Sequence, residues 1–256
     1  MNLTGKLTLI TGASSGIGRA CAEVFAEAGS NLILMARREE KLKELKNDLQ
    51  PHGVKIKTFK VDVRNYEEVK SAIKSLNSEL RNIDILINNA GLARGLEKIQ
   101  EGVLNNWEEM IDTNVKGLLY VSREVLPIMA ERKHGHVINI GSIAGHEVYP
   151  GGNVYCGTKH AVKAISKAMM IDMNGTNVRV TSIDPGLVET EFSKVRFHGD
   201  TDKAENVYKG YQPLRGSDIA EIALFAATRP LHVDMQQILV TPTAQATATI
   251  LNKTEA

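Results

Sequence analysis

Residues 7–18 read Leu-Thr-Leu-Ile-Thr-Gly-Ala-Ser-Ser-Gly-Ile-Gly, and they give the strongest indication of the fold class. The apolar run over residues 7–11 predicts a strand, and the periodicity over residues 16–28 predicts a helix. Glycines between them let the backbone approach a pyrophosphate, whose charge the free N–H groups of a helix N-terminus attract. The spacing Gly-x-x-x-Gly-x-Gly departs from the usual Gly-x-Gly-x-x-Gly, so a purely structural turn stays the alternative. We expect dinucleotide contacts from Gly12, Ser14, Ser15, Gly16, Ile17 and Gly18.

Short apolar runs alternate with longer helix-like stretches along the rest of the chain. Strands are expected at residues 31–36, 54–61, 83–87, 137–140, 178–183 and 238–240, and helices at residues 39–49, 66–80, 107–132, 154–174 and 217–227. This alternation predicts a single doubly wound α/β Rossmann domain, with helices on both faces of a parallel sheet. We expect one domain over residues 1–256, an irregular substrate lid over 188–216 and a C-terminal tail over 246–256.

The composition argues against several classes of protein. The net charge is +1, from 31 basic and 30 acidic residues, and no basic stripe suggests a nucleic-acid partner. No apolar run approaches the roughly 18 residues of a membrane helix, and the N-terminus has no signal-peptide pattern. Two cysteines, Cys21 and Cys156, cannot make a disulfide framework. We therefore expect a cytoplasmic protein with a small-molecule substrate, no nucleic-acid or membrane partner and no metal.

The end of the second expected strand reads Met35-Ala36-Arg37-Arg38. A NAD site usually has Asp or Glu near this point to bind the ribose 2′-OH. Two guanidinium groups instead suit a 2′-phosphate, through charge-assisted hydrogen bonds. The alternative, that Arg37 and Arg38 are solvated residues at a helix start, is weakened because arginine is not favoured beside a helix N-terminus. The expected cofactor is therefore NADP.

Tyr155 and Lys159 lie four residues apart on an expected helix, so both side chains face the same way. A free phenol has a pKa of about 10, and a neighbouring ammonium group is expected to lower that pKa by stabilising the phenolate. Tyr155 could then give a proton to a carbonyl oxygen or take one from an alcohol. An isolated Tyr-x-x-x-Lys is usually a pair of surface residues with no catalytic role, so this prediction depends on the residues around it.

Other polar residues follow expected strands, whose carboxyl ends border the ligand crevice of a parallel sheet. Ser142 is placed to donate to the same substrate oxygen as Tyr155, unless it is only a turn residue. Asn89-Ala90-Gly91 suggests a further cofactor contact or a plain strand terminus. Asp62-Val63 could meet an adenine ring, or Asp62 could cap a helix. Asn114 lies inside an expected helix, where a satisfied buried amide is the alternative.

These motifs together resemble the short-chain dehydrogenase/reductases over nearly the whole chain. The motifs are Thr-Gly-Ala-Ser-Ser-Gly-Ile-Gly at 11–18, Asn-Asn-Ala-Gly at 88–91, Asn114, Ser142, Tyr-Cys-Gly-Thr-Lys at 155–159 and Pro-Gly at 185–186. The resemblance implies a catalytic tetrad of Asn114, Ser142, Tyr155 and Lys159, in which Asn114 holds a water that links Lys159 to solvent. It also implies a homotetramer built partly on the long helices, and nicotinamide contacts from Pro185, Gly186, Val188 and Thr190.

A narrower resemblance rests on Gly151-Gly152-Asn153-Val154-Tyr155, on Thr190-Glu191-Phe192-Ser193 and on Val240-Thr241-Pro242. These stretches are similar to the NADP-dependent 3-hydroxy acid dehydrogenases, also described as serine or allo-threonine dehydrogenases. The resemblance implies that a short 3-hydroxy acid is interconverted with its 3-oxo acid. Such a substrate carries a carboxylate, for which Arg196 is the first candidate ligand and Arg94 the second. Arg94 stands where the family typically has a small or apolar residue, and either arginine could instead be a solvated surface residue.

Two other functions stay open at this stage. A reductase of bulkier ketones or of carrier-linked 3-ketoacyl groups would use the same chemistry, and a basic docking face would favour it. A non-catalytic NADP-binding module is less favoured, because a binder has no need of the proton donor that Ser142, Tyr155 and Lys159 provide.

Overall fold

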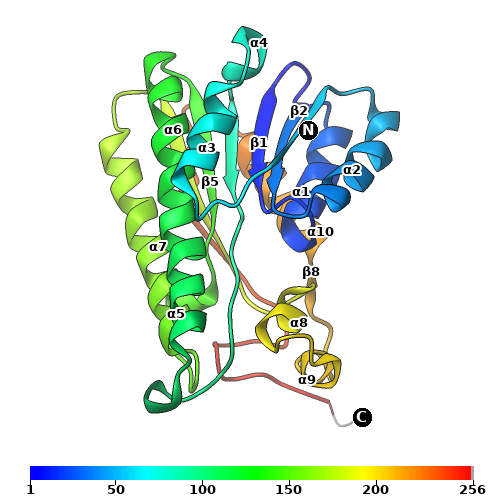
Figure 1. The fold of residues 1–256 in the computed structure, drawn as a ribbon, viewed down its shortest axis with the longest axis vertical. Coiled ribbons are helices and arrows are strands. Elements are labelled where there is room, and N and C mark those ends of the chain that lie inside the picture. The colour runs from blue at the N-terminus through cyan, green and yellow to red at the C-terminus, as the bar shows by residue number, and fades with distance from the viewer. Residues whose placement is uncertain (255–256) are drawn as a thin grey trace.

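Seven strands form one twisted parallel sheet in the computed structural model, which describes residues 1–254 (Figure 1). The strands lie in the order β3-β2-β1-β4-β5-β6-β9, and each neighbouring pair is parallel. Their bounds are Leu7–Thr11 for β1, Asn31–Ala36 for β2, Ile56–Lys60 for β3, Ile85–Asn88 for β4, Gly135–Ile140 for β5, Val178–Pro185 for β6 and Gln237–Val240 for β9. The strand order reverses between β1 and β4, where a doubly wound sheet opens a crevice. The predicted fold class is confirmed.

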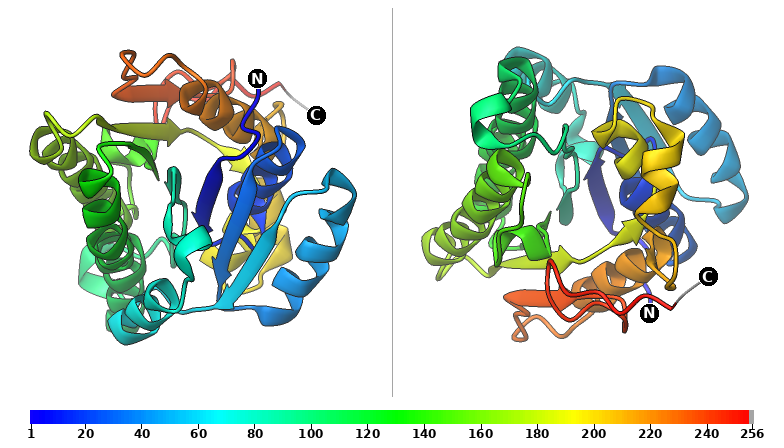
Figure 2. Two further views of the ribbon diagram at one scale, coloured as in Figure 1. Left: turned by 90° about the horizontal axis from the view of Figure 1, so that it is seen from above. Right: turned by 90° about the horizontal axis from the view of Figure 1, so that it is seen from below.

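Successive residues of the central strands point into two separate apolar cores, because strand side chains alternate between the faces of a sheet. In β1, Ile10 packs into one core and Leu9 into the other, and both are fully buried. Figure 2 shows the sheet between two layers of helices. One layer holds α1 (Gly16–Glu27), α2 (Glu39–Asp48) and α10 (Gly216–Ala227); the other holds α3 (Tyr66–Lys74), α6 (Leu118–Glu131) and α7 (Asn153–Asp172).

Two of the expected helices are interrupted. The helix expected over 66–80 is α3 followed by α4 (Ser78–Arg81), because the Asn77 side chain accepts a hydrogen bond from Leu80 N and starts a new helix. The helix expected over 107–132 begins earlier, as α5 (Leu104–Ile111), and reaches α6 through a π-helical turn over Asp112–Gly117. Such π turns are frequent at functional sites. Short 3₁₀ turns cover Gln50–His52, Ile99–Glu101 and Ile143–Gly145.

The segment over 188–216, which we call the lid segment, is more regular than expected. It contains α8 (Phe192–Arg196) and α9 (Thr201–Asn206), and a small parallel pair of β7 (Val188–Glu189) and β8 (Leu214–Arg215). These elements lie beyond the carboxyl ends of the central strands, at the lower end of Figure 1.

The last part of the chain crosses the same end of the molecule. Thr254 N donates to Gly210 O of the lid segment, and Ala248 N donates to the Glu147 carboxylate. Residues 255–256 of the expected tail lie outside the described residues. None of the helices within residues 1–254 is long and apolar enough to cross a membrane. The same residues hold no cluster of three or more His, Cys, Asp or Glu side chains that could bind a metal.

Candidate active site

A cavity of about 470 Å³ opens at the carboxyl ends of the strands, between the glycine turn after β1 and the lid segment. It brings together nearly all of the site residues that the sequence predicts. Those that line it are Gly12, Ser14, Ser15, Gly16, Ile17, Arg37, Arg38, Asp62, Val63, Asn89, Ala90, Gly91, Ser142, Tyr155, Lys159, Pro185, Gly186, Val188, Thr190 and Arg196. Two predicted residues, Gly18 and Asn114, lie outside this lining.

The glycine turn lines the cavity where α1 begins. Gly12 and Gly16 have φ of +66° and +54°, which other residues rarely adopt. Ser15 precedes α1 without a capping bond from its side chain, and the first turn of α1 has no acidic residue. The helix N-terminus is therefore open to an anion such as a pyrophosphate. Gly18 has a packing role instead, since a Cβ there would lie 2.4 Å from both Gly12 O and Asn89 Nδ2.

Arg38 reaches across the glycine turn to the lid segment. Its Nε and Nη2 donate to Ser14 Oγ at 3.2 and 3.1 Å, and Nη2 also donates to Ser15 Oγ at 2.6 Å. Its Nη1 pairs with Glu191 Oε2 at 2.9 Å. Arg37 is half-exposed, and its Nη1 lies 3.6 Å from Glu109 Oε1. Arg37 and Arg38 both line the cavity, where a 2′-phosphate could accept hydrogen bonds from their guanidinium groups.

The expected adenine contact involves an arginine that the sequence reasoning overlooked. Arg64 donates from Nε and Nη2 to the Asp62 carboxylate at 2.6–3.0 Å. Burial raises the pKa of the Asp62 carboxyl, but the hydrogen bonds from Arg64 outweigh it and hold that pKa below its ordinary value. Asp62 is therefore an ionised acceptor at the cavity wall, and Val63 lines the same wall.

Ser142, Tyr155 and Lys159 converge from two elements. Ser142 is the second residue after β5, where its Oγ accepts from Ala144 N at 3.1 Å and begins a 3₁₀ turn. Tyr155 and Lys159 lie one turn apart on α7 and are both buried. Lys159 Nζ donates to Ile140 O at 2.9 Å and lies 6.0 Å from the centre of the Tyr155 ring.

Burial dominates the ionisation of this pair. It raises the pKa of the Tyr155 hydroxyl well above its ordinary value, whereas the charge of Arg196 and a hydrogen bond from Ser142 lower it. Burial also lowers the pKa of Lys159 to about 8, opposed by the charge of Asp184. The expected lowering of the Tyr155 pKa by Lys159 is therefore not found here, because loss of water from around the phenolate outweighs the nearby cations.

Asn114 lies in the π-helical turn behind the cavity wall, and its amide is fully engaged. Its Oδ1 accepts from Leu92 N at 2.8 Å, and its Nδ2 donates to Leu92 O at 2.8 Å and to Thr158 Oγ1 at 3.0 Å. A Cβ built on Gly91 would lie 3.3 Å from Asn114 Oδ1 and 3.7 Å from Lys159 Nζ. Asn114 therefore lies close to Lys159 and ties the strand-end loop to α7.

Arg196 of α8 lies above the tyrosine. Its guanidinium carbon is 5.0 Å from the centre of the Tyr155 ring, and its Nη2 donates to Tyr149 Oη at 2.6 Å. Arg196 Nε is buried and has no hydrogen-bond partner within residues 1–254. Arg196 also lines the cavity, so its guanidinium is available to an anionic ligand there.

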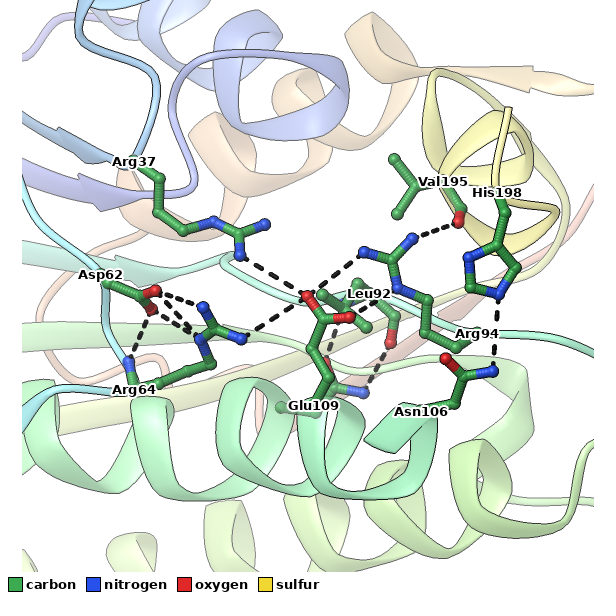
Figure 3. A network of polar contacts seen from close by, with 10 residues as sticks. Arg37, Asp62, Arg64, Leu92, Arg94, Asn106, Glu109, Val195 and His198 are labelled. Atoms are coloured by element: carbon green, nitrogen blue, oxygen red, sulfur yellow. Dashed lines mark hydrogen bonds and ion pairs between the residues drawn. The ribbon is translucent and has the colours of Figure 1, made fainter. Parts of the chain in front are cut away.

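Arg94 also lines the cavity, but its guanidinium nitrogens are already engaged. Its Nε and Nη2 donate to the Glu109 carboxylate at 2.7 and 3.2 Å, and its Nη1 donates to Val195 O at 2.6 Å (Figure 3). These contacts favour Arg196 over Arg94 as the carboxylate ligand. Glu109, Glu191 and Tyr149 were missed from the sequence, because no local pattern marks a residue whose partner lies far along the chain.

This arrangement can move a proton to or from an oxygen held between Ser142 and Tyr155. Arg196 offers a cation on the same side of the cavity, and the glycine turn offers donors for phosphates. Together these groups form a site for a phosphate-bearing cofactor beside a small anionic substrate.

Comparison with known proteins agrees with this geometry. The NADP-dependent 3-hydroxy acid dehydrogenase YdfG of Escherichia coli strain K12 is 46% identical over 243 residues, covering 94% of this chain and 97% of that protein. The NADP-dependent 3-hydroxy acid dehydrogenase of Schizosaccharomyces pombe is 46% identical over 245 residues, covering 95% of each chain. The closed form of a serine dehydrogenase complexed with NADP⁺ has a TM-score of 0.91 and 45% identity, covering 98% of this chain and all of that one.

The family model described as short chain dehydrogenase matches residues 6–200. This range contains the glycine turn, Ser142, Tyr155, Lys159 and the start of the lid segment. The chain belongs to the short-chain dehydrogenase family.

Proposed function

We propose that the chain is an NADP-dependent oxidoreductase that interconverts short 3-hydroxy acids and their 3-oxo acids. The relatives that are about 46% identical along nearly their whole length carry this description. The observation that carries the substrate class is Arg196, which lines the cavity with its guanidinium carbon 5.0 Å from the centre of the Tyr155 ring.

The residues present fit NADP. The open N-terminus of α1 and the glycines of the turn would hold the pyrophosphate, and Arg37 and Arg38 would hold the 2′-phosphate. Asp62-Val63 would border the adenine, and Asn89-Ala90-Gly91 the adjoining ribose. Pro185, Gly186, Val188 and Thr190 also line the cavity, where they would border the nicotinamide. When bound, this cofactor exchanges a hydride with the carbinol carbon of the substrate.

We assign the proton transfer to Tyr155. In oxidation its phenolate takes the hydroxyl proton of the 3-hydroxy acid, and in reduction its phenol returns that proton to the carbonyl oxygen. Ser142 donates to the same oxygen, and Lys159 supplies positive charge that favours the phenolate. Asn114 keeps the loop after β4 beside Lys159, where a water could link that ammonium group to solvent.

The substrate carboxylate is assigned to Arg196. A carboxylate in the cavity would pair with the Arg196 guanidinium and neutralise its charge. The hydroxyl of a 3-hydroxy acid lies two carbons from the carboxylate, which suits a cation 5.0 Å from the Tyr155 ring centre.

Further features of the chain are part of the proposal. Residues 1–256 act as one domain, 188–216 closes over the substrate, and the tail from 246 supports that lid through Thr254 and Gly210. A homotetramer is supported by exposed apolar residues on α5 and α6, such as Leu104, Ile111 and Leu119. Two free cysteines suit the cytoplasm, a reducing compartment.

Turnover of a substrate panel tests this function. NADP⁺ would be supplied with serine, 3-hydroxybutyrate and an uncharged secondary alcohol, and NADPH with bulky uncharged ketones. We expect the highest kcat/KM with the 3-hydroxy acids. Preference for bulky ketones would instead identify a general ketone reductase, and NADP binding without turnover of any compound would identify a binding module. Higher kcat/KM with NAD⁺ than with NADP⁺ would overturn the cofactor assignment.

A further inference from the structure

Glu109 of α5 gathers three arginines from different parts of the chain (Figure 3). Arg94 donates two hydrogen bonds to its carboxylate, and Arg37 and Arg64 each lie 3.6 Å from Oε1. The side chains of Arg94 and Glu109 are 18% and 20% exposed, so this pair is shielded from most of the solvent. Hydrogen bonds from Arg94 hold the pKa of Glu109 below its ordinary value, which keeps the carboxylate ionised.

The remaining guanidinium nitrogen of Arg94 joins Glu109 and its arginines to the lid segment. Its Nη1 donates to Val195 O, the residue before Arg196, and Gly95 N donates to Arg196 O at 2.9 Å. Helix α8 has only five residues, so its last carbonyls need donors from outside the helix. Residues 94 and 95 therefore hold the end of α8 by two bonds, one from a side chain and one from the backbone.

We propose that Arg94 is a positioning residue for substrate recognition. Fixed by Glu109, it holds Val195 so that the Arg196 guanidinium stays above Tyr155 and presents its positive charge to the substrate carboxylate. This inference rests on the proposed function, because Arg196 is given its task there.

The shape of the guanidinium group makes this role specific to arginine. Nε and Nη2, along one edge of the planar group, donate to the two oxygens of Glu109, while Nη1 donates to Val195 O on α8. A lysine at position 94 has a single ammonium group and cannot hold both partners in the same geometry. Loss of Arg94 leaves Glu109 near Arg37 and Arg64, so the variant does not bury an unpaired charge.

The test compares R94L, R94K, R196A and the double variant R94L/R196A. The readout is the KM for 3-hydroxybutyrate relative to that for an uncharged secondary alcohol. We expect R94L to raise this ratio about tenfold, R94K to restore part of it, and R196A to raise it more. In the R196A background, R94L should leave the KM ratio unchanged, because Arg94 affects substrate binding only by positioning Arg196. R19L is the matched control, since Arg19 of α1 pairs with Glu23 on the same helix and with Asp48 of α2, neither of which belongs to α8 or to residues 94–95.

Hydrogen exchange of residues 192–199 gives a second readout that does not depend on substrate. R94L should speed amide exchange in these residues relative to the native chain and to R19L. The exchange rate of R94K should lie between those of R94L and the native chain. An unchanged exchange rate, or equal effects of R94L with and without R196A, overturns the positioning role. If R196A leaves the KM ratio unchanged while R94L still speeds exchange, the substrate assignment fails and the contact between Arg94 and α8 stands.

Discussion

Arg38 Nη1 and Glu191 Oε2 lie 2.9 Å apart and join the end of β2 to the lid segment. The hydrogen bond from Arg38 lowers the pKa of Glu191, so a full negative charge stands beside the arginine expected to hold a 2′-phosphate. A bound phosphate and the Glu191 carboxylate would therefore compete for the same guanidinium group. The acid on the lid segment thus opposes NADP binding while it restrains the lid.

Replacing Glu191 by Gln should tighten NADPH binding about three- to tenfold, since one like charge is removed from a partly exposed site. NADH has no 2′-phosphate, so its Kd should change little. R38L is the opposing variant and should weaken NADPH binding about tenfold or more. Fluorescence titration with both cofactors measures these effects. Weaker NADPH binding by E191Q would mean that Glu191 orients Arg38 rather than competing with the phosphate.

Replacing Tyr155 by Phe should lower kcat about 10²- to 10⁴-fold, because the aromatic ring remains while the hydroxyl that donates the proton is lost. Binding of NADPH should persist, since the backbone of the glycine turn is unchanged. Y66F is the matched control, because it removes a hydroxyl that donates to Glu124, between α3 and α6 and not at the cavity. Full activity in Y155F, measured by NADPH consumption, would move the proton transfer to another group.

Lys159 should make stability depend on pH above neutrality. Burial lowers its pKa to about 8, against an ordinary value of 10.5. Below pH 8 Lys159 is protonated in both the folded and the unfolded chain, and burial of its ammonium group lowers the free energy of unfolding. Between about pH 8 and 10.5 only the unfolded chain holds it, so the free energy of unfolding rises with pH.

The variant K159M isolates this effect. The free energy of unfolding of the native chain, minus that of K159M, should rise by on the order of 3 kcal/mol between pH 8 and 10.5. Urea unfolding at a series of pH values measures the difference, in which the other titrating groups cancel. A difference that is flat across this range would mean that Lys159 has an ordinary pKa in the fold.

The parts of the fold that were predicted correctly depend on local patterns. Local residue patterns predict the strand over residues 7–11, the glycine turn and the helix that follows. The topology of a parallel sheet then predicts that Ser142 lies near Tyr155 in the cavity. The break at Asn77 was missed because continuous helical periodicity hides a capping side chain. The regular elements of the lid segment are short and have little periodicity to detect.

The rest of the site depends on tertiary contacts. No sequence rule shows that Arg94 meets Glu109 and Val195, since these contacts form only when α8 packs against residues 94–95. The pKa of Tyr155 was expected to fall from a charge argument alone, yet it rises because burial is a property of the packed molecule.

Gly18 and Gly157 form a matched pair that tests the packing behind the glycine turn. Both lie in helices, but a Cβ on Gly18 would come within 2.4 Å of Gly12 O and Asn89 Nδ2, whereas a Cβ on Gly157 would meet nothing within 4 Å. The carbonyl of Gly12 belongs to the turn itself, so it cannot move aside without changing the proposed phosphate site.

G18A should therefore destabilise the chain by about 1–3 kcal/mol. In a domain of this size each kcal/mol lowers Tm by about 2–4 °C. NADPH binding should weaken in the same variant, because the turn is displaced. G157A should instead stabilise the chain by up to about 1 kcal/mol, since alanine is the better helix former. Thermal unfolding with and without NADPH measures both effects. Equal Tm values for the two variants would mean that the turn yields to the added methyl group and that Gly18 is not required for close packing.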